Sequence, residues 1–517
     1  MSEKKHVLLS SKLKRYSIIN IKKAIFLFVL TFSIFIVSVK YSSANKKQPN
    51  VIVIVADDLG YGDLGSYGQD IIETPNLDRM AAEGMRFTQF YSGSSTCRPA
   101  RCTFVTGLHT GNCYARANNM EMNLRESDLT IAEVLKGKNI ATGMIGKWAL
   151  GEENSSGIPI KQGFDYFYGY LNQKHAHNSY PEFLIEDTER VKLENRVPDP
   201  GEHGEGVATV KKEYSNDLFT DKALQFISQH QQKQFFLYLA YTIPHANNEA
   251  KSLGLEVPDL GIYKAMDLLP SQKAYAAMVT RMDNYIGKIV RALNERGLEK
   301  NTVIIFTSDN GSHREGGYDP ELLNSNSNLR GMKKELYEGG IRVPLIIWNP
   351  GSIEPGVSDL ISYFPDLFPT VADLADIKQT YSVDGISLYP TLVGQDQSQK
   401  QHEYLYWEFH GSKGAQAVRM GDWKSVTQPY NGTMELYNLS QDIGETNNVA
   451  DKHPSIVSTH QQIIDRAHQD LPLVENIRIT IERVGRYQIA LYALCIVVAI
   501  AILFLGCIKL IQRLKRA

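Results

Sequence analysis

The chain has 517 residues, 43% hydrophobic and 22% charged, which is enough for one large globular domain and a smaller one. Its net charge of −2 conceals an acidic centre, because 43 basic residues face 56 acidic ones once the ends 1–44 and 509–517 are set aside. This excess argues against nucleic acid as a partner, since cationic contacts to phosphate dominate such binding. Five cysteines form no evident disulfide framework; a Cys102–Cys113 disulfide stays open and would leave Cys97 unpaired and reactive.

The two ends of the chain have the composition of membrane-targeting segments. Residues 1–44 begin with a basic stretch, continue with an uncharged apolar run and end in small residues, the order of a secretory signal peptide; an uncleaved anchor is the alternative. Residues 489–508 carry no charge and are long enough to cross a bilayer as a helix. The basic tail 509–517 is expected in the cytoplasm. We therefore predict a single-pass protein of the cell membrane, with a stalk over 476–488 and its body outside the cytoplasm, periplasmic or extracellular.

Between these ends, apolar strands alternate with amphipathic helices. The β-branched run 51–56 is typical of a strand buried on both faces. Further strands are expected at 141–145, 234–241 and 302–307, and helices from residue 74, over 130–136 and over 274–296. This alternation predicts an α/β fold over 45–378, with a large doubly wound sheet, mixed but mainly parallel, flanked by helices.

The pattern changes beyond residue 378. Short strands separated by turn residues are expected at 404–407, 417–420, 423–426 and 435–438. A helix is expected within 453–470. We therefore predict a small C-terminal subdomain over 379–475, built of an antiparallel sheet with one helix.

Three of the predicted strands end in polar residues that can bind a metal or an anion. Asp57 and Asp58 end the first, His245 follows the strand at 234–241, and Asp309 and Asn310 follow the strand at 302–307. Ligands bind at the carboxyl edge of open α/β sheets. The carboxylate and amide oxygens of the two pairs favour Ca²⁺ or Mg²⁺ over zinc.

Several cationic residues could form an anion socket beside that metal. Lys147 follows the strand at 141–145, Lys333 precedes a glycine-rich turn, and Arg101 lies four residues after Cys97. Together with His245 they would place positive charge around a tetrahedral oxyanion.

These segments resemble those of the type I sulfatases, in the alkaline-phosphatase-like superfamily. They occur in family order from about residue 50 to 345: VADDLG at 55–60, TPNLD at 74–78, CRPARCTFVTG at 97–107, GKW at 146–148, PH at 244–245, SDNG at 308–311 and YEGGIRVP at 337–344. A further match, LYNL at 436–439 with Asp442, Glu445 and Asn448, falls in the C-terminal region.

The resemblance implies a modified nucleophile and a metal. Cys97 would be oxidised to formylglycine by a maturation enzyme, and the hydrated aldehyde, rather than a thiolate, would attack the sulfur. The metal would be calcium, less readily magnesium, and its ligands would be Asp57, Asp58, Asp309, Asn310 and the modified Cys97.

The resemblance also implies roles for the cationic residues. Arg101 would orient the modified side chain, while Lys147, His245 and Lys333 would hold the sulfate. His245 or Lys333 would protonate the departing alcohol. The second hydroxyl of the hydrated aldehyde would then expel sulfate and restore the aldehyde.

Two positions depart from the family pattern. Ala100 stands where the family usually has serine, a variant that the family tolerates. The motif GKWHLG becomes GKWALG, so Ala149 replaces a histidine that is thought to assist the modified side chain. His175 and His177 are the candidates to replace that histidine or to contact the substrate.

The expected function is therefore hydrolysis of a sulfate ester, on a sulfated carbohydrate or an aryl sulfate. The alternatives are a phosphate or phosphonate monoester hydrolase of the same superfamily, and a surface binding protein whose site decayed through Ala149. Substrate specificity is expected from the loops 152–215, 246–270 and 312–328, with His410 from the small subdomain.

Overall fold

The computed structural model describes residues 48–118, 122–378, 381–410, 414–430 and 432–469. The predicted signal segment, stalk, membrane span and basic tail lie outside these ranges. Within them, every helix is too short or too polar to cross a bilayer. The chain divides after Gln48, and all the elements below belong to the second unit, which begins at Pro49.

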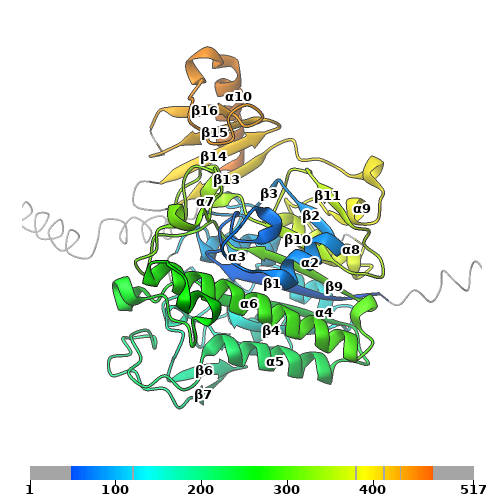
Figure 1. The fold of residues 1–517 in the computed structure, drawn as a ribbon. Coiled ribbons are helices and arrows are strands. Elements are labelled where there is room, and N and C mark those ends of the chain that lie inside the picture. Colours follow the sequence, from blue (N-terminus) through cyan, green and yellow to red (C-terminus); the bar gives the residue numbers. More distant parts are fainter. Residues whose placement is uncertain (1–47, 119–121, 379–380, 411–413, 431, 470–517) are drawn as a thin grey trace, which may run out of the picture. The chain divides into compact units, whose positions relative to one another are not determined.

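A mixed sheet of ten strands lies at the centre of the described residues (Figure 1). Its order is β11 (Gly356–Ser358), β2 (Met85–Phe87), β10 (Leu345–Trp348), β9 (Thr302–Ser308), β1 (Asn50–Asp57), β8 (Phe235–Pro244), β4 (Ala141–Lys147), β5 (Tyr166–Tyr170), β6 (Phe183–Glu186) and β7 (Glu189–Lys192). The five strands from β9 to β5 are parallel, whereas β10, β6 and β7 pair antiparallel. This confirms the predicted mixed, mainly parallel sheet.

Strand β1 shows how helices come to cover both faces of the sheet. Ile52 and Ile54 belong to one hydrophobic cluster and Val51 and Val53 to another, because successive side chains of a strand point to opposite faces. The helices on the first face are α2 (Pro75–Glu83), α5 (Ser215–Gln229) and α6 (Pro270–Glu295). Those on the second face are α3 (Cys97–Thr106), α4 (Ile131–Lys136) and α8 (Leu367–Leu374).

Two predicted strands extend further than the sequence indicates. The strand expected at 141–145 continues through Lys147, so this lysine is the last residue of β4 rather than a residue of the following loop. The strand expected at 234–241 continues to Pro244. Both extensions carry the polar residues at the strand ends towards the same edge of the sheet.

A second, antiparallel sheet forms the C-terminal part of the described chain (Figure 1). Its strands are β13 (Leu405–Phe409), β14 (Ala415–Met420), β15 (Trp423–Thr427) and β16 (Met434–Asn438), and α10 (Pro454–Ala467) packs on it. The indole Nε1 of Trp407 donates a hydrogen bond of 2.8 Å to the carbonyl of Ser92, which ties this sheet to the larger part. The remaining short elements are β3 (Phe90–Tyr91) paired with β12 (Ser362–Tyr363), α7 (Glu338–Ile341) and α9 (Tyr389–Leu392).

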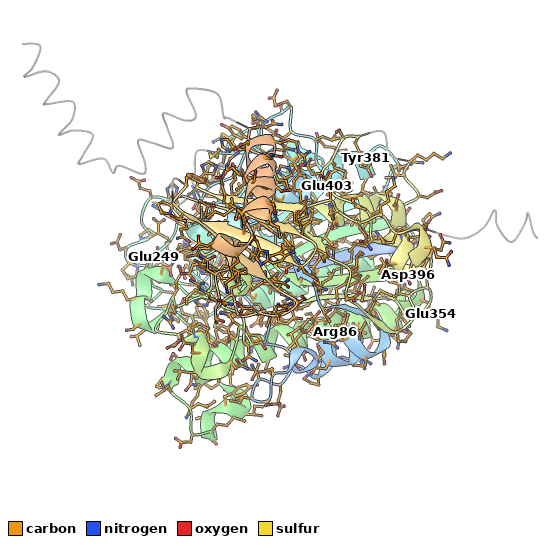
Figure 2. All side chains as sticks on the ribbon, turned by 90° about the horizontal axis from the view of Figure 1, so that it is seen from above. Arg86, Glu249, Glu354, Tyr381, Asp396 and Glu403 are labelled. Carbon is orange, nitrogen blue, oxygen red and sulfur yellow. The ribbon has the colours of Figure 1, made fainter. Side chains whose placement is uncertain are left out.

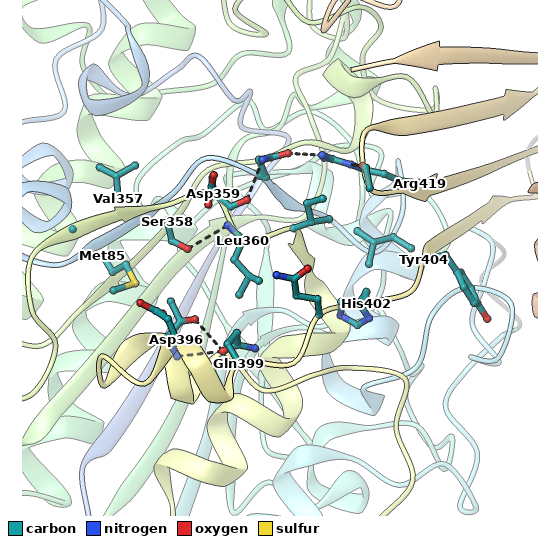
Figure 3. A pocket seen from close by; sticks show the side chains of 17 residues that line it. Met85, Val357, Ser358, Asp359, Leu360, Asp396, Gln399, His402, Tyr404 and Arg419 are labelled. Atoms are coloured by element: carbon teal, nitrogen blue, oxygen red, sulfur yellow. Dashed lines mark hydrogen bonds between the residues drawn. The ribbon is translucent and has the colours of Figure 1, made fainter. Parts of the chain in front are cut away.

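A cavity of about 530 Å³ lies between the β2–β11 edge of the large sheet and the segment that leads into the small sheet (Figure 3). Met85, Val357, His402 and Arg419 are among its lining residues. No residue of the predicted metal and anion sites lines it. This cavity is therefore separate from the predicted metal and anion site at the strand ends.

Candidate active site

The two acidic pairs lie side by side at the carboxyl edge of the sheet. Strands β1 and β9 run parallel and in register up to Ala56 and Ser308, so the residues that follow leave the sheet at the same edge. The backbone N–H of Asp58 lies 3.2 Å from Oδ1 of Asp309 and donates to it. Asn310 Nδ2 donates to Oδ1 of Asp58 at 2.7 Å. Residues about 250 positions apart in sequence thus form one cluster of oxygen atoms.

Cys97 joins this cluster from the first turn of α3. Its side chain is buried, and ligand atoms of Asp57, Cys97 and Asp309 all lie within 4.8 Å of one another. Burial raises the pKa of the Cys97 thiol above its ordinary value, and the two aspartates add to the shift. The pocket therefore disfavours a thiolate at this position.

Arg101 lies one helical turn after Cys97 and joins two strand ends. Its Nε and Nη2 donate to Oδ2 of Asp309 at 3.0 and 2.7 Å. Its Nη1 donates to the backbone carbonyl of Lys147 at 2.5 Å. The guanidinium group therefore holds the end of β4 beside the segment that follows β9.

Each of the two lysines pairs with one aspartate of the β1 end. Lys147 Nζ donates to Oδ2 of Asp57 at 2.7 Å, and both side chains are fully buried. Lys333 Nζ donates to Oδ2 of Asp58 and to Oε2 of Glu315, both at 2.8 Å. Burial opposes the charge of Lys333, but the two carboxylates outweigh it and raise its pKa well above the ordinary value. Two ammonium groups thus stand charged beside the nucleophile position.

His245 accepts a hydrogen bond from Lys333. Its Nδ1 lies 2.7 Å from the carbonyl oxygen of Ala246, which can only accept, so Nδ1 carries the proton. Its Nε2 lies 3.0 Å from Lys333 Nζ. Burial and the neighbouring Lys333 lower the pKa of His245 to about 3. The imidazole is therefore neutral at ordinary pH, with its free nitrogen directed at a proton donor.

The oxygen cluster fits a divalent cation. Oδ1 of Asp57 and Oδ1 of Asn310 are buried and accept no hydrogen bond from the described residues. Burial, with a smaller contribution from Asp57, raises the pKa of Asp309 to about 7. Unpaired buried oxygens are costly, and carboxylate and amide oxygens are the preferred ligands of Ca²⁺ and Mg²⁺.

The comparison with known proteins agrees with this geometry. A family model described as Sulfatase matches residues 49–377, and the model of the N-sulphoglucosamine sulphohydrolase C-terminal region matches 332–473. The chain belongs to the sulfatase family. The resemblance seen in the sequence is thereby confirmed, and the protein is a sulfatase that hydrolyses sulfate esters.

Individual relatives cover most of the sulfatase. It is 32% identical over 456 residues to N-acetylgalactosamine-6-sulfatase of Mus musculus, across 83% of this chain and 80% of the relative. It is 29% identical to N-acetylgalactosamine-6-O-sulfatase of Bacteroides thetaiotaomicron, across 82% and 94%. Among solved structures, Ps i-CgsB in complex with k-i-k-neocarrahexaose matches with a TM-score of 0.70 and 25% identity, across 86% of this chain and 99% of that one.

The two candidate histidines of the sulfatase have different surroundings. The ring of His177 stacks on that of His245, with 5.0 Å between centroids and 17° between planes. Its Nδ1 lies 3.3 Å from Oε1 of Glu249, which lies at the periphery of the view in Figure 2. His175 instead packs against the rings of Tyr170 and Phe183, and burial lowers its pKa to about 3. His177 thus lies beside the site, whereas the placement of His175 gives a catalytic role no support.

Two residues that touch the site carry no sequence motif. Gln173 Nε2 donates to Sγ of Cys97 at 2.8 Å, and Glu315 holds Lys333 as described. Both lie in loops predicted to shape specificity, 152–215 and 312–328, but no motif marks them. Only their contacts reveal them.

The structure also describes Cys102, Cys113 and His410. Cys102 and Cys113 are free thiols, so the disulfide left open by the sequence is absent. His410 pairs with Glu408 of β13, at 2.8 Å between Nε2 and Oε1.

Proposed function

We propose that this sulfatase removes sulfate from a sulfated carbohydrate, by means of a formylglycine at position 97 beside a divalent cation, calcium rather than magnesium. The observation that supports the proposal is the buried cluster in which Cys97 meets Asp57 and Asp309, with an ammonium group on either side. The carbohydrate is supported by the names of the relatives, two of which are N-acetylgalactosamine-6-sulfatases, and by the hexaose bound to Ps i-CgsB.

The cation would be held by Asp57, Asp58, Asp309, Asn310 and the modified residue 97. When bound, it would withdraw charge from the sulfate oxygens as a Lewis acid, and formylglycine would supply an oxygen nucleophile where a thiolate is disfavoured. Oδ1 of Asp57 and Oδ1 of Asn310, which accept no hydrogen bond from the described residues, are available for such an ion, although Arg101 Nη2 lies 3.7 Å from the former.

The basic residues would bind the sulfate and protonate the departing alcohol. Lys147 and Lys333 present ammonium protons to the sulfate oxygens from two sides. Lys333 Nζ holds a proton 3.0 Å from Nε2 of neutral His245. The departing alcohol therefore receives its proton by one of two routes. The proton comes directly from Lys333 Nζ, or it passes first from Nζ to His245 Nε2 and then to the alcohol. Charge of this kind, placed before the reaction, is the usual source of a large part of catalysis.

Two measurements on the purified full chain test the proposal. Mass spectrometry of the peptide that contains position 97 should show the aldehyde in place of the thiol. Rates on matched aryl sulfate and aryl phosphate esters should favour the sulfate, and a panel of sulfated saccharides should contain a better substrate than either. A faster phosphate ester would support a phosphate or phosphonate hydrolase instead, and bound metal without any turnover would support the decayed binding protein.

A further inference from the structure

Gln173 contacts the residue at the centre of the site. Its side chain is only 7% exposed, and its Nε2 lies 2.8 Å from Sγ of Cys97. The other end of the amide, Oε1, is buried and has no hydrogen-bond partner among the described residues. A thiol is a weak donor and a weak acceptor, so an unmodified Cys97 leaves this amide poorly satisfied.

An oxygen atom would suit the same contact better than sulfur does. A separation of 2.8 Å is within the normal range for an N–H···O hydrogen bond. A hydroxyl group donates one hydrogen bond and can also accept, and the amide of Gln173 offers an acceptor and a donor in return. The surroundings of position 97 therefore match a hydroxyl-bearing side chain.

Gln173 also comes from the segment next to Ala149, where the family motif has histidine. The backbone N–H of Ala149 donates to the carbonyl of Leu171 at 3.1 Å, and that of Trp148 donates to Tyr170 at 2.9 Å. These bonds continue the pairing of β4 with β5 beyond the strand ends. Gln173 therefore lies two residues after the residue whose backbone pairs with Ala149.

We propose that Gln173 positions the nucleophile in this sulfatase, in the role that Ala149 cannot perform. Its Nε2 donates to the oxygen of the modified residue 97, and its Oε1 accepts the O–H proton. The role rests on the proposed function, because an unmodified thiol has no such hydroxyl. An amide has no titratable proton, so Gln173 orients the nucleophile, and proton transfer stays with Lys333 and His245.

Three substitutions of Gln173 test this role, with one control. Gln173→Met keeps the length of the side chain without its hydrogen bonds, Gln173→Ala removes it, and Gln173→His supplies a donor and an acceptor again. The control is Gln162→Ala, since Gln162 is also buried but donates to the carbonyls of Arg125 and Ser156. Each protein is measured for its melting temperature, the fraction of residue 97 that is modified, and kcat and KM on one aryl sulfate across pH.

We expect Gln173→Met and Gln173→Ala to lower kcat per modified molecule about tenfold, with KM changed less than about twofold, because the amide touches residue 97 rather than the substrate. Gln173→His should recover much of the loss and add a titration near the ordinary imidazole pKa of about 6.5 to the kcat profile. Gln162→Ala should lower the melting temperature without changing kcat per modified molecule.

Three results would overturn the role of Gln173. The first is wild-type kcat per modified molecule in Gln173→Met, which keeps the packing if Gln173→Ala fails to fold. The second is an equal loss of kcat in Gln162→Ala, and the third is a Gln173→His variant no faster than Gln173→Met. An unmodified Cys97 in the active wild-type enzyme would instead reject the proposed function, and the role of Gln173 with it; mass spectrometry alone shows this.

Discussion

At position 177 an imidazole lies face to face with the ring of His245 and within 3.3 Å of Glu249 Oε1. The side chain of His177 is 12% exposed, against 2% for that of His245, so His177 is the more accessible of the stacked pair. The stacked ring of His177 therefore helps to hold the neutral His245 in the orientation in which its Nε2 faces Lys333.

We expect His177→Ala to lower kcat by roughly tenfold or more, towards the low end of the loss seen for a general acid or base. Steady-state rates on the best sulfated saccharide are the measurement. His230→Ala is a control histidine, because His230 contacts the carbonyl of Phe226 in α5 instead of the site. Near-wild-type turnover in His177→Ala would remove His177 from the mechanism.

At this scale the sequence predicts the residues that follow strands and not those in long loops. Asp57 and Asp309 were predictable as neighbours, because parallel strands end at a common edge. Gln173 and Glu315 lie in segments without periodicity, where no local rule relates sequence to position. Their partners, Cys97 and Lys333, are brought to them by the tertiary fold.

Among the elements, β4 shows why strand ends are harder to predict than strand centres. The predicted strand ended at Ile145, just before Gly146. Here φ of Gly146 is 106°, and a Cβ at this position would lie 1.9 Å from the carbonyl oxygen of Ala240 in β8. Only glycine allows the two backbones to approach so closely, and the strand therefore continues to Lys147. Gly146 thus places Lys147 at the end of β4.

Helix α10 is joined to the small sheet by a histidine that stays neutral in the folded protein. Nδ1 of His460 lies 2.8 Å from Oγ of Ser425 in β15, and its Nε2 is buried without a partner among the described residues. Burial lowers the pKa of His460 to about 4. In the unfolded chain His460 has an ordinary pKa of about 6.5, so it binds a proton in a pH range where the folded chain keeps it neutral.

Stability should therefore fall as the pH falls from about 6.5 towards 4, and this contribution should be constant above that range. Between pH 7.5 and 5 the loss from His460 alone is about 2 kcal/mol. Denaturant unfolding at the two pH values is the measurement, with His460→Gln expected to lose less stability on acidification than the wild type. His203→Gln, at a histidine whose side chain is 27% exposed, should behave as the wild type does. Equal acid sensitivity in His460→Gln and the wild type would contradict this account.

In the whole molecule, the metal and anion site joins segments that are far apart along the chain. Its oxygen atoms come from the ends of β1 and β9, its nucleophile position from α3, and one ammonium group from Lys333. The architecture behind this was predictable, because alternating strands and helices favour a doubly wound sheet. The position of the small sheet was not, since it depends on side-chain contacts such as that of Trp407 with Ser92.

Because the site joins these segments only in the folded state, a bound cation should stabilise the whole molecule. A ligand at a thousand times its Kd adds about 4 kcal/mol to the free energy of unfolding, so calcium should raise the melting temperature by several degrees and a chelator should reverse the rise. Magnesium at the same concentration should have the smaller effect, because calcium accepts irregular sets of protein oxygens more readily.

Asp57→Asn is the variant that tests the site, since it keeps the shape of the side chain and weakens one ligand. It should lose most of the calcium-dependent rise in melting temperature. Asp70→Asn removes the same charge from an exposed residue and should keep the full rise. Two results would contradict a cation in the oxygen cluster. One is a wild-type melting temperature that neither calcium nor the chelator changes, and the other is an Asp70→Asn variant that loses the rise as Asp57→Asn does. The buried oxygens of Asp57 and Asn310 would then need another partner.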